Sequence, residues 1–226
     1  MTFSLVARDN SGAAPAYGMV ICSSSPAVAS RCAHLRAGVG AVASQNVTNP
    51  HLGRVGLDAL ASGLGAEQAL KSVLDHERFP DYRQLIIVGP SGATAIHTGE
   101  RALGIRHEIQ AESAAAAGNM LRSEGVITAL LFGYTSSSGE TFESRLLDGL
   151  AAALEAGGEA GPVHSAGLVV VEDVPWPVTD LRVDWHDDPV GELRRLWQVW
   201  GPQKADYRLR GLDPSGAPTY GVPGDM

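Results

Sequence analysis

The sequence predicts an α+β fold in which antiparallel sheets are layered with helices. The strand patterns come in adjacent pairs along the chain rather than singly between helices, which is typical of antiparallel sheets and not of doubly wound parallel ones. Helical patterns lie between those pairs. The chain has 226 residues, 44% of them hydrophobic, so it is long enough to bury a full core without disulfides or metals.

The first two predicted strands form an antiparallel pair. Residues 2–7 alternate, so that the even-numbered side chains face one way and the odd-numbered ones the other. Residues 9–12 carry turn-forming types, and the apolar run 17–22 predicts the second strand. This strand ends at Ser23-Ser24-Ser25-Pro26, where the chain must leave the sheet.

Strands and helices then alternate in groups. The small apolar residues 37–43 predict a buried strand that ends in a polar segment. Leucines at helical spacing predict one helix over residues 57–64 and a second over 67–74. A Pro-Ser-Gly turn between residues 84–88 and 93–97 predicts a hairpin.

The second half of the predicted domain repeats this grouping. Residues 99–122 lack a clean periodicity, which predicts loops around a short helix. Two helices are predicted near residues 123–135 and 141–156. The apolar run 166–171 and the alternating run 180–186 predict another strand pair.

The last predicted helix begins at Asp188, a favoured capping residue, with Pro189 in the first helical position. Beyond that helix the pattern fades, and scattered Gly and Pro predict an extended tail that wraps the domain or a partner. We therefore divide the chain into a domain of residues 1–200 and a tail of residues 201–226.

Charge and composition exclude several classes of protein. The chain has 17 Lys and Arg against 25 Asp and Glu, a net charge of −8, whereas a nucleic-acid-binding protein needs clustered positive charge. No apolar run reaches the length of a membrane helix, and the first residues do not resemble a secretory signal, so we expect a cytoplasmic protein. Cys22 and Cys32 form no metal-binding pattern. We expect them to be small buried hydrophobes and predict no cofactor.

One strand carries a polar face that could bind a metal. Asp180, Arg182, Asp184 and His186 project together at i, i+2 spacing. A divalent metal would need a further ligand, for which His164 is a candidate. The alternative is a solvated face on which the arginine pairs with its neighbours. The chain has no phosphate-binding loop, HExxH helix motif or GxSxG nucleophile motif.

Thr2 is a candidate nucleophile. An initiator methionine before a small residue is normally removed, and its removal would leave Thr2 with a free α-amine. The pKa of an α-amine is about 7.7–8.0, so it can accept the proton of the threonine hydroxyl at neutral pH. One residue then supplies both the nucleophile and the base. While Met1 is attached, that nitrogen is a peptide nitrogen and the base is missing. The alternative is an ordinary start of a strand.

Several segments together resemble one known family. They are Thr-Phe-Ser-Leu-Val-Ala at 2–7, Arg-Ala-Gly-Val-Gly-Ala-Val-Ala-Ser-Gln at 36–45, Asn-Pro at 49–50, Arg-Gln-Leu at 83–85, His-Thr-Gly-Glu at 97–100, Gly-Asn-Met-Leu at 118–121, Asp-Leu-Arg-Val-Asp at 180–184, His186, Asp-Pro at 188–189 and Glu-Leu-Arg-Arg-Leu at 192–196. This combination resembles an uncharacterised bacterial family, the domain of unknown function numbered 1028, which is grouped with the N-terminal nucleophile (Ntn) hydrolases.

The resemblance implies a four-layer αββα sandwich of two antiparallel sheets between helices, with an active site at the start of the first strand. It implies no substrate. The sequence departs from the family at residues 23–25, where this chain has three serines and other members can carry Lys or Arg. A cation there would lower the pKa of the Thr2 amine and help to bind an anionic group, so its absence weakens the analogy with proteasome-like sites.

Other residues would have to support Thr2 in catalysis. Asn119, beside a flexible glycine, is the first candidate for an oxyanion donor, and Gln45 at the end of a buried strand is the second. Ser23 or Ser24 should reach the Thr2 hydroxyl or amine, because they end the strand that pairs with the first. The alternative for the two amides is that they cap backbone groups in turns.

We assign His97 and Asn49 to substrate binding, although His97 can equally be a hydrogen-bonded histidine on an edge strand. The leading hypothesis is an Ntn-type amidohydrolase or peptidase that cleaves a small amide bond through Thr2, with a small amide or peptide as substrate and a homodimeric assembly. One alternative is a non-catalytic binding or assembly module on the same fold. A second is a metal-dependent hydrolase that uses the Asp180, Asp184 and His186 face.

Overall fold

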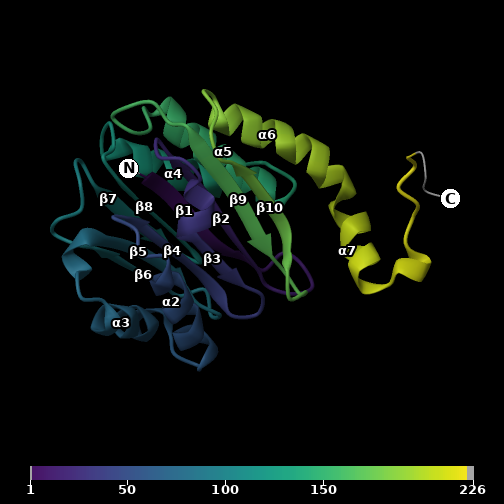
Figure 1. The fold of residues 1–226 in the computed structure, drawn as a ribbon, viewed down its shortest axis with the longest axis horizontal. Coiled ribbons are helices and arrows are strands. Elements are labelled where there is room, and N and C mark those ends of the chain that lie inside the picture. Colours follow the sequence, from purple (N-terminus) through teal and green to yellow (C-terminus); the bar gives the residue numbers. More distant parts are fainter. Residues whose placement is uncertain (1, 223–226) are drawn as a thin grey trace.

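The computed structural model describes residues 2–222, and within that range the strands form two antiparallel sheets (Figure 1). The first sheet contains β1 (Thr2–Asp9), β2 (Ala16–Ser23), β7 (His107–Ala111), β8 (Ala114–Asn119), β9 (Ser165–Val171) and β10 (Pro177–Val183), in the order β10-β9-β2-β1-β8-β7. The second contains β3 (Ala33–Arg36), β4 (Gly40–Asn46), β5 (Arg83–Val88) and β6 (Thr94–Thr98), in sequence order. The predicted antiparallel pairing of the first two strands is confirmed.

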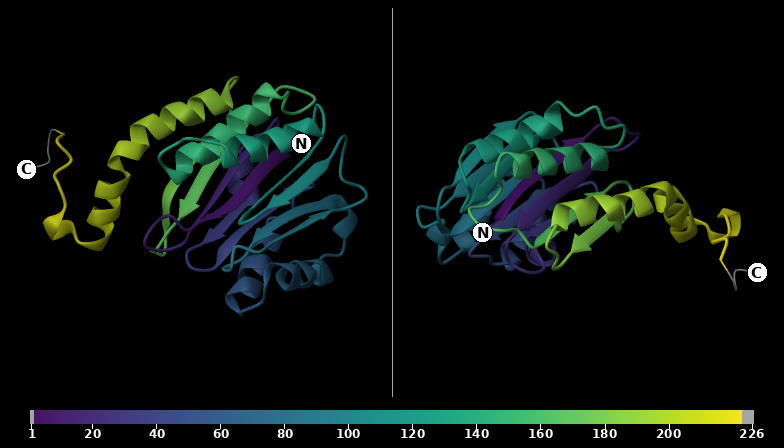
Figure 2. Two further views of the ribbon diagram at one scale, coloured as in Figure 1. Left: turned by 180° about the vertical axis from the view of Figure 1, so that it is seen from behind. Right: turned by 90° about the horizontal axis from the view of Figure 1, so that it is seen from above.

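Helices cover the outer face of each sheet. The smaller sheet is covered by α2 (His51–Ala61) and α3 (Ala66–His76), and the larger one by α4 (Gly125–Thr135), α5 (Phe142–Glu155) and α6 (Pro189–Trp200). The short α1 (Val28–Cys32) packs against Ile21 of β2, and α7 (Lys204–Leu212) follows α6 away from the sandwich (Figure 1). In Figure 2 the pair α2 and α3 lies on one side of the sandwich, and α4, α5 and α6 lie on the other. The α+β class and the four-layer αββα sandwich are therefore confirmed.

Alternation along β1 decides which layer each of its side chains enters. Phe3 and Leu5 pack with the apolar residues of α4 and α5, including Leu130 and Leu146. Val6 faces the other way and packs in the core between the two sheets. Because β1 is central in the larger sheet, both of its faces are buried and its few polar side chains lie inside the protein.

Residues 99–122 differ from the prediction. They form the hairpin of β7 and β8, not loops around a short helix. The reason is that β8 consists of small residues buried on both faces. Ala114 and Ala116 pack toward the helices, whereas Ala115 and Ala117 pack between the sheets. A strand that is buried on both sides shows no polar-apolar alternation, so no period of two marks it in the sequence.

Two predicted strand boundaries also change. The strand predicted over residues 37–43 is β4, which begins at Gly40 and includes the polar residues up to Asn46, because residues 41–46 pair with β5. The strand predicted over 180–186 is β10, which ends at Val183. Asp188 does cap α6, because its side chain accepts a hydrogen bond from the Gly191 backbone at 3.0 Å.

The predicted extended tail is wrong for residues 204–212, which form α7. This helix is held by ion pairs that the sequence does not show. Lys204 contacts Glu143 at 2.8 Å and Glu172 at 2.7 Å, and Arg208 contacts Asp173 at 2.5 Å. The division at residue 200 stays a prediction. None of the helices within residues 2–222 has the length and apolar character that crossing a membrane requires.

Candidate functional site

Thr2 begins the central strand of the larger sheet, at the end of the sandwich opposite α7 (Figure 1). Its side chain has the same parity as Ser4 and Val6 and therefore faces the space between the two sheets. Only 3% of the residue is exposed. A threonine that merely starts a strand is usually at the surface, so a buried one facing the interior needs polar neighbours.

Those neighbours form one row across four strands. Thr2 is directly opposite Asn119 on β8, and Ser23 on β2 is opposite Ser165 on β9. The pairing of Phe3 with Cys22 sets the β1–β2 register, which places Thr2 beside Ser23. The row is therefore Ser165, Ser23, Thr2 and Asn119, and all four are buried. The structure brings together three of the residues that we predicted for the site: Thr2, Ser23 and Asn119.

A network of amides supports this row from the second sheet. Gln84 on β5 is its centre: its Oε1 accepts hydrogen bonds from Asn119 Nδ2 at 3.0 Å and from Gln45 Nε2 at 2.8 Å. Its Nε2 donates to Thr98 Oγ1 and to the Gly118 carbonyl, both at 3.0 Å. We did not predict Gln84. A glutamine inside an otherwise apolar strand was the only signal in the sequence that could have found it.

Gln45 is close to the row but has no spare donor. Its Oε1 accepts from Ser4 Oγ at 2.8 Å, and its Nε2 donates to Gln84 Oε1 and to the Ala117 carbonyl at 3.1 Å. Both N–H bonds of the amide are thus used, so the arrangement does not suit the role of oxyanion donor that we predicted. Asn119 differs, because its Nδ2 donates to Gln84 and keeps a second N–H bond.

A positive charge does lie near the serines, although it does not come from residues 23–25. Arg31 of α1 donates to Ser25 Oγ at 2.9 Å, and Ser25 Oγ is 2.8 Å from Ser23 Oγ. A cation therefore contacts Ser25 from a position six residues further along the chain. The sequence did not reveal this, because it requires α1 to turn back over the end of β2.

The segment of residues 157–164 closes the same end of the sandwich. Glu159 lies in it and is 3% exposed. One carboxylate oxygen, Oε1, accepts a hydrogen bond from the Ser24 backbone at 3.1 Å. Burial raises the pKa of Glu159, against the opposing effects of the Ser24 hydrogen bonds and of His164. We had predicted Ser24 for this site, but not Glu159, and His164 only as a metal ligand.

Comparisons with known proteins agree with this architecture. The sequence profile of a family described as a family of unknown function (DUF1028) matches residues 2–193. The chain belongs to the DUF1028 family. The crystal structure of protein SPO2555 from Silicibacter pomeroyi, assigned to DUF1028, is 31% identical to this chain and superposes with a TM-score of 0.83. The match covers 91% of this chain and 92% of that one. The family resemblance in the sequence is thus confirmed.

Other likenesses are weaker. Anbu (ancestral beta-subunit) from Yersinia bercovieri is 13% identical to this DUF1028 chain, with a TM-score of 0.40 over 92% of this chain and 97% of that one. No curated protein matches the chain. Membership of DUF1028 therefore brings no activity with it, and the chemistry has to be argued from the site itself.

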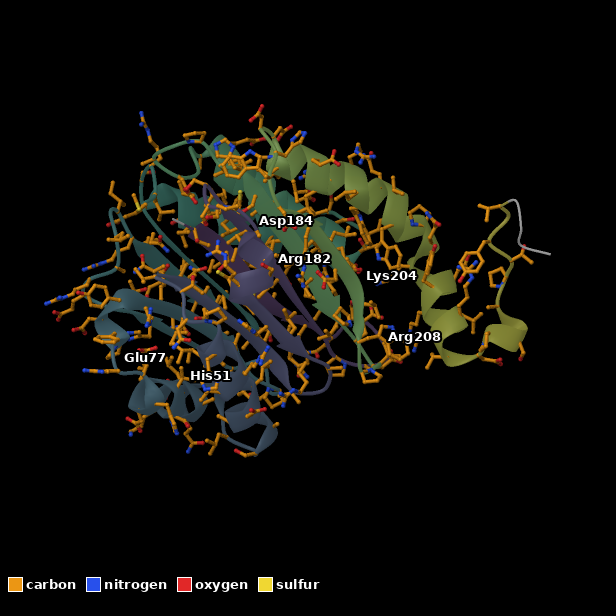
Figure 3. All side chains as sticks on the ribbon, in the orientation of Figure 1. His51, Glu77, Arg182, Asp184, Lys204 and Arg208 are labelled. Carbon is orange, nitrogen blue, oxygen red and sulfur yellow. The ribbon has the colours of Figure 1, made fainter. Side chains whose placement is uncertain are left out.

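Two predicted substrate-binding residues lie elsewhere in this DUF1028 protein. His97 is paired with Leu85, which packs against α2 and α3, so its side chain faces that helical layer and not the space between the sheets. Its Nε2 is 3.0 Å from the Pro80 carbonyl. Asn49 donates to Glu77 at 2.9 Å and accepts from the His51 backbone at the start of α2. Figure 3 shows His51 and Glu77 in the layer of α2 and α3.

The polar face of β10 does not form a metal site. Asp180 is held by two hydrogen bonds from Arg182, at 2.7 and 2.9 Å, and His186 lies beyond the end of the strand, where its Nδ1 contacts the Asp188 backbone. Among residues 2–222, no group of three or more His, Cys, Asp or Glu side chains could hold a metal ion. The structure agrees with our alternative interpretation, a solvated face on which Arg182 pairs with a neighbouring carboxylate.

A cavity of about 630 Å³ lies at the opposite end of β1 from Thr2. Its lining includes Asp9, Phe142, Glu143, Trp197 and Lys204. In Figure 3, Lys204 and Arg208 lie between the sandwich and the arm formed by α6 and α7. Most charges here are paired with opposite ones, such as Asp9 with Arg145 at 2.9 Å. We predicted no site at this end.

Proposed function

We propose that this protein is an Ntn-type amidohydrolase or peptidase that cleaves a small amide bond through Thr2. The observation that carries the proposal is the row of four buried polar side chains around the first residue of a central strand. A buried polar atom without a hydrogen-bond partner lowers stability, and Asn119 Oδ1 in this row has none within residues 2–222, which favours a purpose other than folding. Family membership supports the fold and leaves the reaction open.

The reaction requires removal of Met1. The free amine of Thr2 then takes the proton of Thr2 Oγ, and Oγ attacks the carbonyl carbon of the substrate amide. The tetrahedral intermediate collapses when the amine returns the proton to the leaving nitrogen, which leaves an ester on Thr2. A water molecule, deprotonated by the same amine, hydrolyses that ester and restores the enzyme.

Asn119 and Ser23 are placed to assist these steps. The second N–H bond of the Asn119 amide can donate to the developing oxyanion, while Gln84 fixes the orientation of that amide. Ser23 lies beside Thr2 in the row, and its hydroxyl connects through Ser25 to Arg31. The positive charge of Arg31 favours the neutral form of the Thr2 amine, which is the form that acts as the base.

The test is acylation of Thr2 itself, which does not depend on the natural substrate. Protein made at low expression level should have lost Met1 by intact mass, and p-nitrophenyl acetate should acylate it in a rapid burst. Thr2→Ser should keep the burst within about tenfold, whereas Thr2→Ala should reduce it by about 100-fold or more. Thr135→Ala, which removes an exposed threonine hydroxyl on α4, is the matched control and should change nothing.

Retention of Met1, or a burst that survives Thr2→Ala, would overturn the proposal. A non-catalytic binding module on the same fold would then be the better explanation, and ligand searches should replace enzyme assays. The small amide or peptide substrate and the homodimer remain proposals as well. Hydrolysis of a library of short amides and a sedimentation experiment would test them separately.

A further inference from the structure

We propose that Glu159 is the positioning residue that holds the α-amine of the processed Thr2, so that its lone pair points at its own hydroxyl. This inference rests on the proposed function. A neutral amine has two N–H bonds and one lone pair. If nothing accepts those N–H bonds, the lone pair has no preferred direction. An acceptor fixed at the start of β1 removes that freedom and prepares the proton transfer.

The path of residues 157–164 places Glu159 at the start of β1. On one side this segment bonds to the residues that follow β8: Leu121 forms a bridge with Glu159, and the Ala160 backbone donates to the Met120 carbonyl at 2.9 Å. On the other side, the His164 backbone donates to the Ser23 carbonyl at the end of β2, at 2.8 Å. Because β1 lies between β8 and β2, the segment crosses directly over its first residue.

The carboxylate of Glu159 is held on one side only. Oε1 accepts from the Ser24 backbone, while Oε2 is buried and accepts no hydrogen bond from any residue in the described range 2–222. A buried carboxylate oxygen without a donor lowers stability. Such an atom at this position indicates a donor that belongs to the working enzyme, and the amine of Thr2 is the group that processing creates there.

The charges around this position act in opposite directions. Ionised Glu159 would stabilise the ammonium form of the Thr2 amine, while Arg31 on α1 would destabilise it. His164 from the same segment faces Glu159 and lowers the pKa of its carboxyl. The thiols of Cys22 and Cys32 also lie at this end, and burial raises the pKa of each, so both stay neutral.

The experiment measures the pH midpoint of the p-nitrophenyl acetate burst. Glu159→Gln keeps an acceptor of the same shape but removes the negative charge. It should keep the maximal burst rate within about threefold and move the midpoint down by about one pH unit. Glu159→Ala removes the acceptor and should lower the maximal rate by about tenfold or more at every pH. Glu155→Gln, at the exposed end of α5, is the matched control.

The outcomes separate this inference from the proposed function. If Thr2→Ala keeps the burst, the proposed function fails first. If Thr2→Ala abolishes the burst but both Glu159 variants leave rate and midpoint unchanged, only the role of Glu159 is wrong. A purely structural role would lower the melting temperature without moving the midpoint. If Glu159→Ala does not fold, Glu159→Gln decides alone, because the charge effect does not depend on the alanine variant.

Discussion

The two ends of β1 treat buried polar groups in opposite ways. At the Asp9 end, most charges meet an opposite charge: Asp9 pairs with Arg145, and Lys204 bridges Glu143 and Glu172. At the Thr2 end the polar side chains are mostly neutral, and three buried atoms have no hydrogen-bond partner within residues 2–222. These are Asn119 Oδ1, Glu159 Oε2 and His164 Nδ1. The Asp9 end also has buried atoms without a partner in that range, but these are the guanidinium donors Arg8 Nε and Arg145 Nε. Oxygen acceptors without a donor therefore lie at the Thr2 end, whereas the ion pairs at the Asp9 end stabilise the fold.

The same contrast separates the cavity from the proposed site. The cavity of about 630 Å³ lies at the Asp9 end, but most of its carboxylates form ion pairs with Lys204, Arg208 and Arg145. The Thr2 end holds the groups that could react. The cavity and the candidate reactive groups therefore lie at opposite ends of β1. If this contrast is correct, substitutions at the Asp9 end should lower the free energy of unfolding, and only substitutions at the Thr2 end should slow acylation.

The largest expected effect is on stability at the Asp9 end. Lys204→Met should lower the free energy of unfolding by about 3 kcal/mol, because it leaves the buried Glu143 without its cation. Urea denaturation measures this loss. Lys71→Met, which breaks an exposed i,i+4 pair with Asp75, is the control and should cost under about 0.5 kcal/mol.

The Lys204 variant also tests the division itself. If the Asp9 end is structural, the burst of Thr2 acylation should be unchanged at a temperature where the variant is folded. A burst that falls with Lys204→Met would show that the two ends are coupled, and the contrast between them would fail.

The second effect combines both properties at the Thr2 end. Gln84→Leu removes four hydrogen bonds and leaves the donors of Asn119 and Gln45 without their acceptor, so stability should fall by about 2 kcal/mol. Acylation of Thr2 should slow by about tenfold as well, since the Asn119 amide is no longer oriented. Gln198→Leu, on the exposed side of α6, should do neither. Equal acylation rates in both variants would contradict the role of the network.

The third effect concerns pH, because two carboxyls at the two ends shift in opposite directions. Burial tends to raise the pKa of Asp9, but its hydrogen bonds with Ser11 and its contact with Arg145 lower it below 3.8. Its stabilisation is therefore present above pH 3.8 and is lost as the pH falls through the lowered pKa. Asp9→Asn should cost about 1 kcal/mol at pH 7, and this difference should shrink below pH 3.8.

Glu159 should behave in the reverse way. Its pKa is raised above 4.5, so the folded protein binds this proton more tightly than the unfolded chain does. Stability is then lost as the pH rises from 4.5 through the raised pKa. Glu159→Gln should therefore stabilise the protein by about 1 kcal/mol at pH 7 and have little effect near pH 4. If Asp9→Asn and Glu159→Gln change the free energy of unfolding in the same direction at pH 7, the contrast between the two ends is wrong.

The sequence predicts those parts of the fold that have a local pattern. Paired strand patterns and leucines at helical spacing predicted the layers of sheets and helices, and the segments shared with DUF1028 predicted the family. The β7–β8 hairpin was missed because its alanines are buried on both faces. Helix α7 was missed because the ion pairs of Lys204 and Arg208 connect it to residues far away in the sequence. Contacts of this kind have no local period.

The site residues likewise fall into those that local patterns could predict and those that only contacts between distant segments bring together. Thr2 and Ser23 could be predicted because they lie at neighbouring ends of two predicted strands, and Asn119 because an amide beside a glycine suits an oxyanion donor. Gln84, Arg31 and Glu159 could not, since each reaches the site from another layer or from a connecting segment. Asn49 and His97 were chosen from shared segments alone, and their side chains lie on the other face of the second sheet or beside α2.

The smallest expected effect is on the polar face of β10. The double variant Asp184→Asn with His186→Gln should change stability by less than about 0.5 kcal/mol, because both side chains are exposed. It should leave the burst of Thr2 acylation unchanged, and EDTA should have no influence on that burst in either protein. Metal retained at one equivalent after dialysis by the unaltered protein, and lost by the double variant, would restore the metal-dependent alternative. In that case the chemistry would lie on β10, and the contrast between the two ends of β1 would describe stability alone.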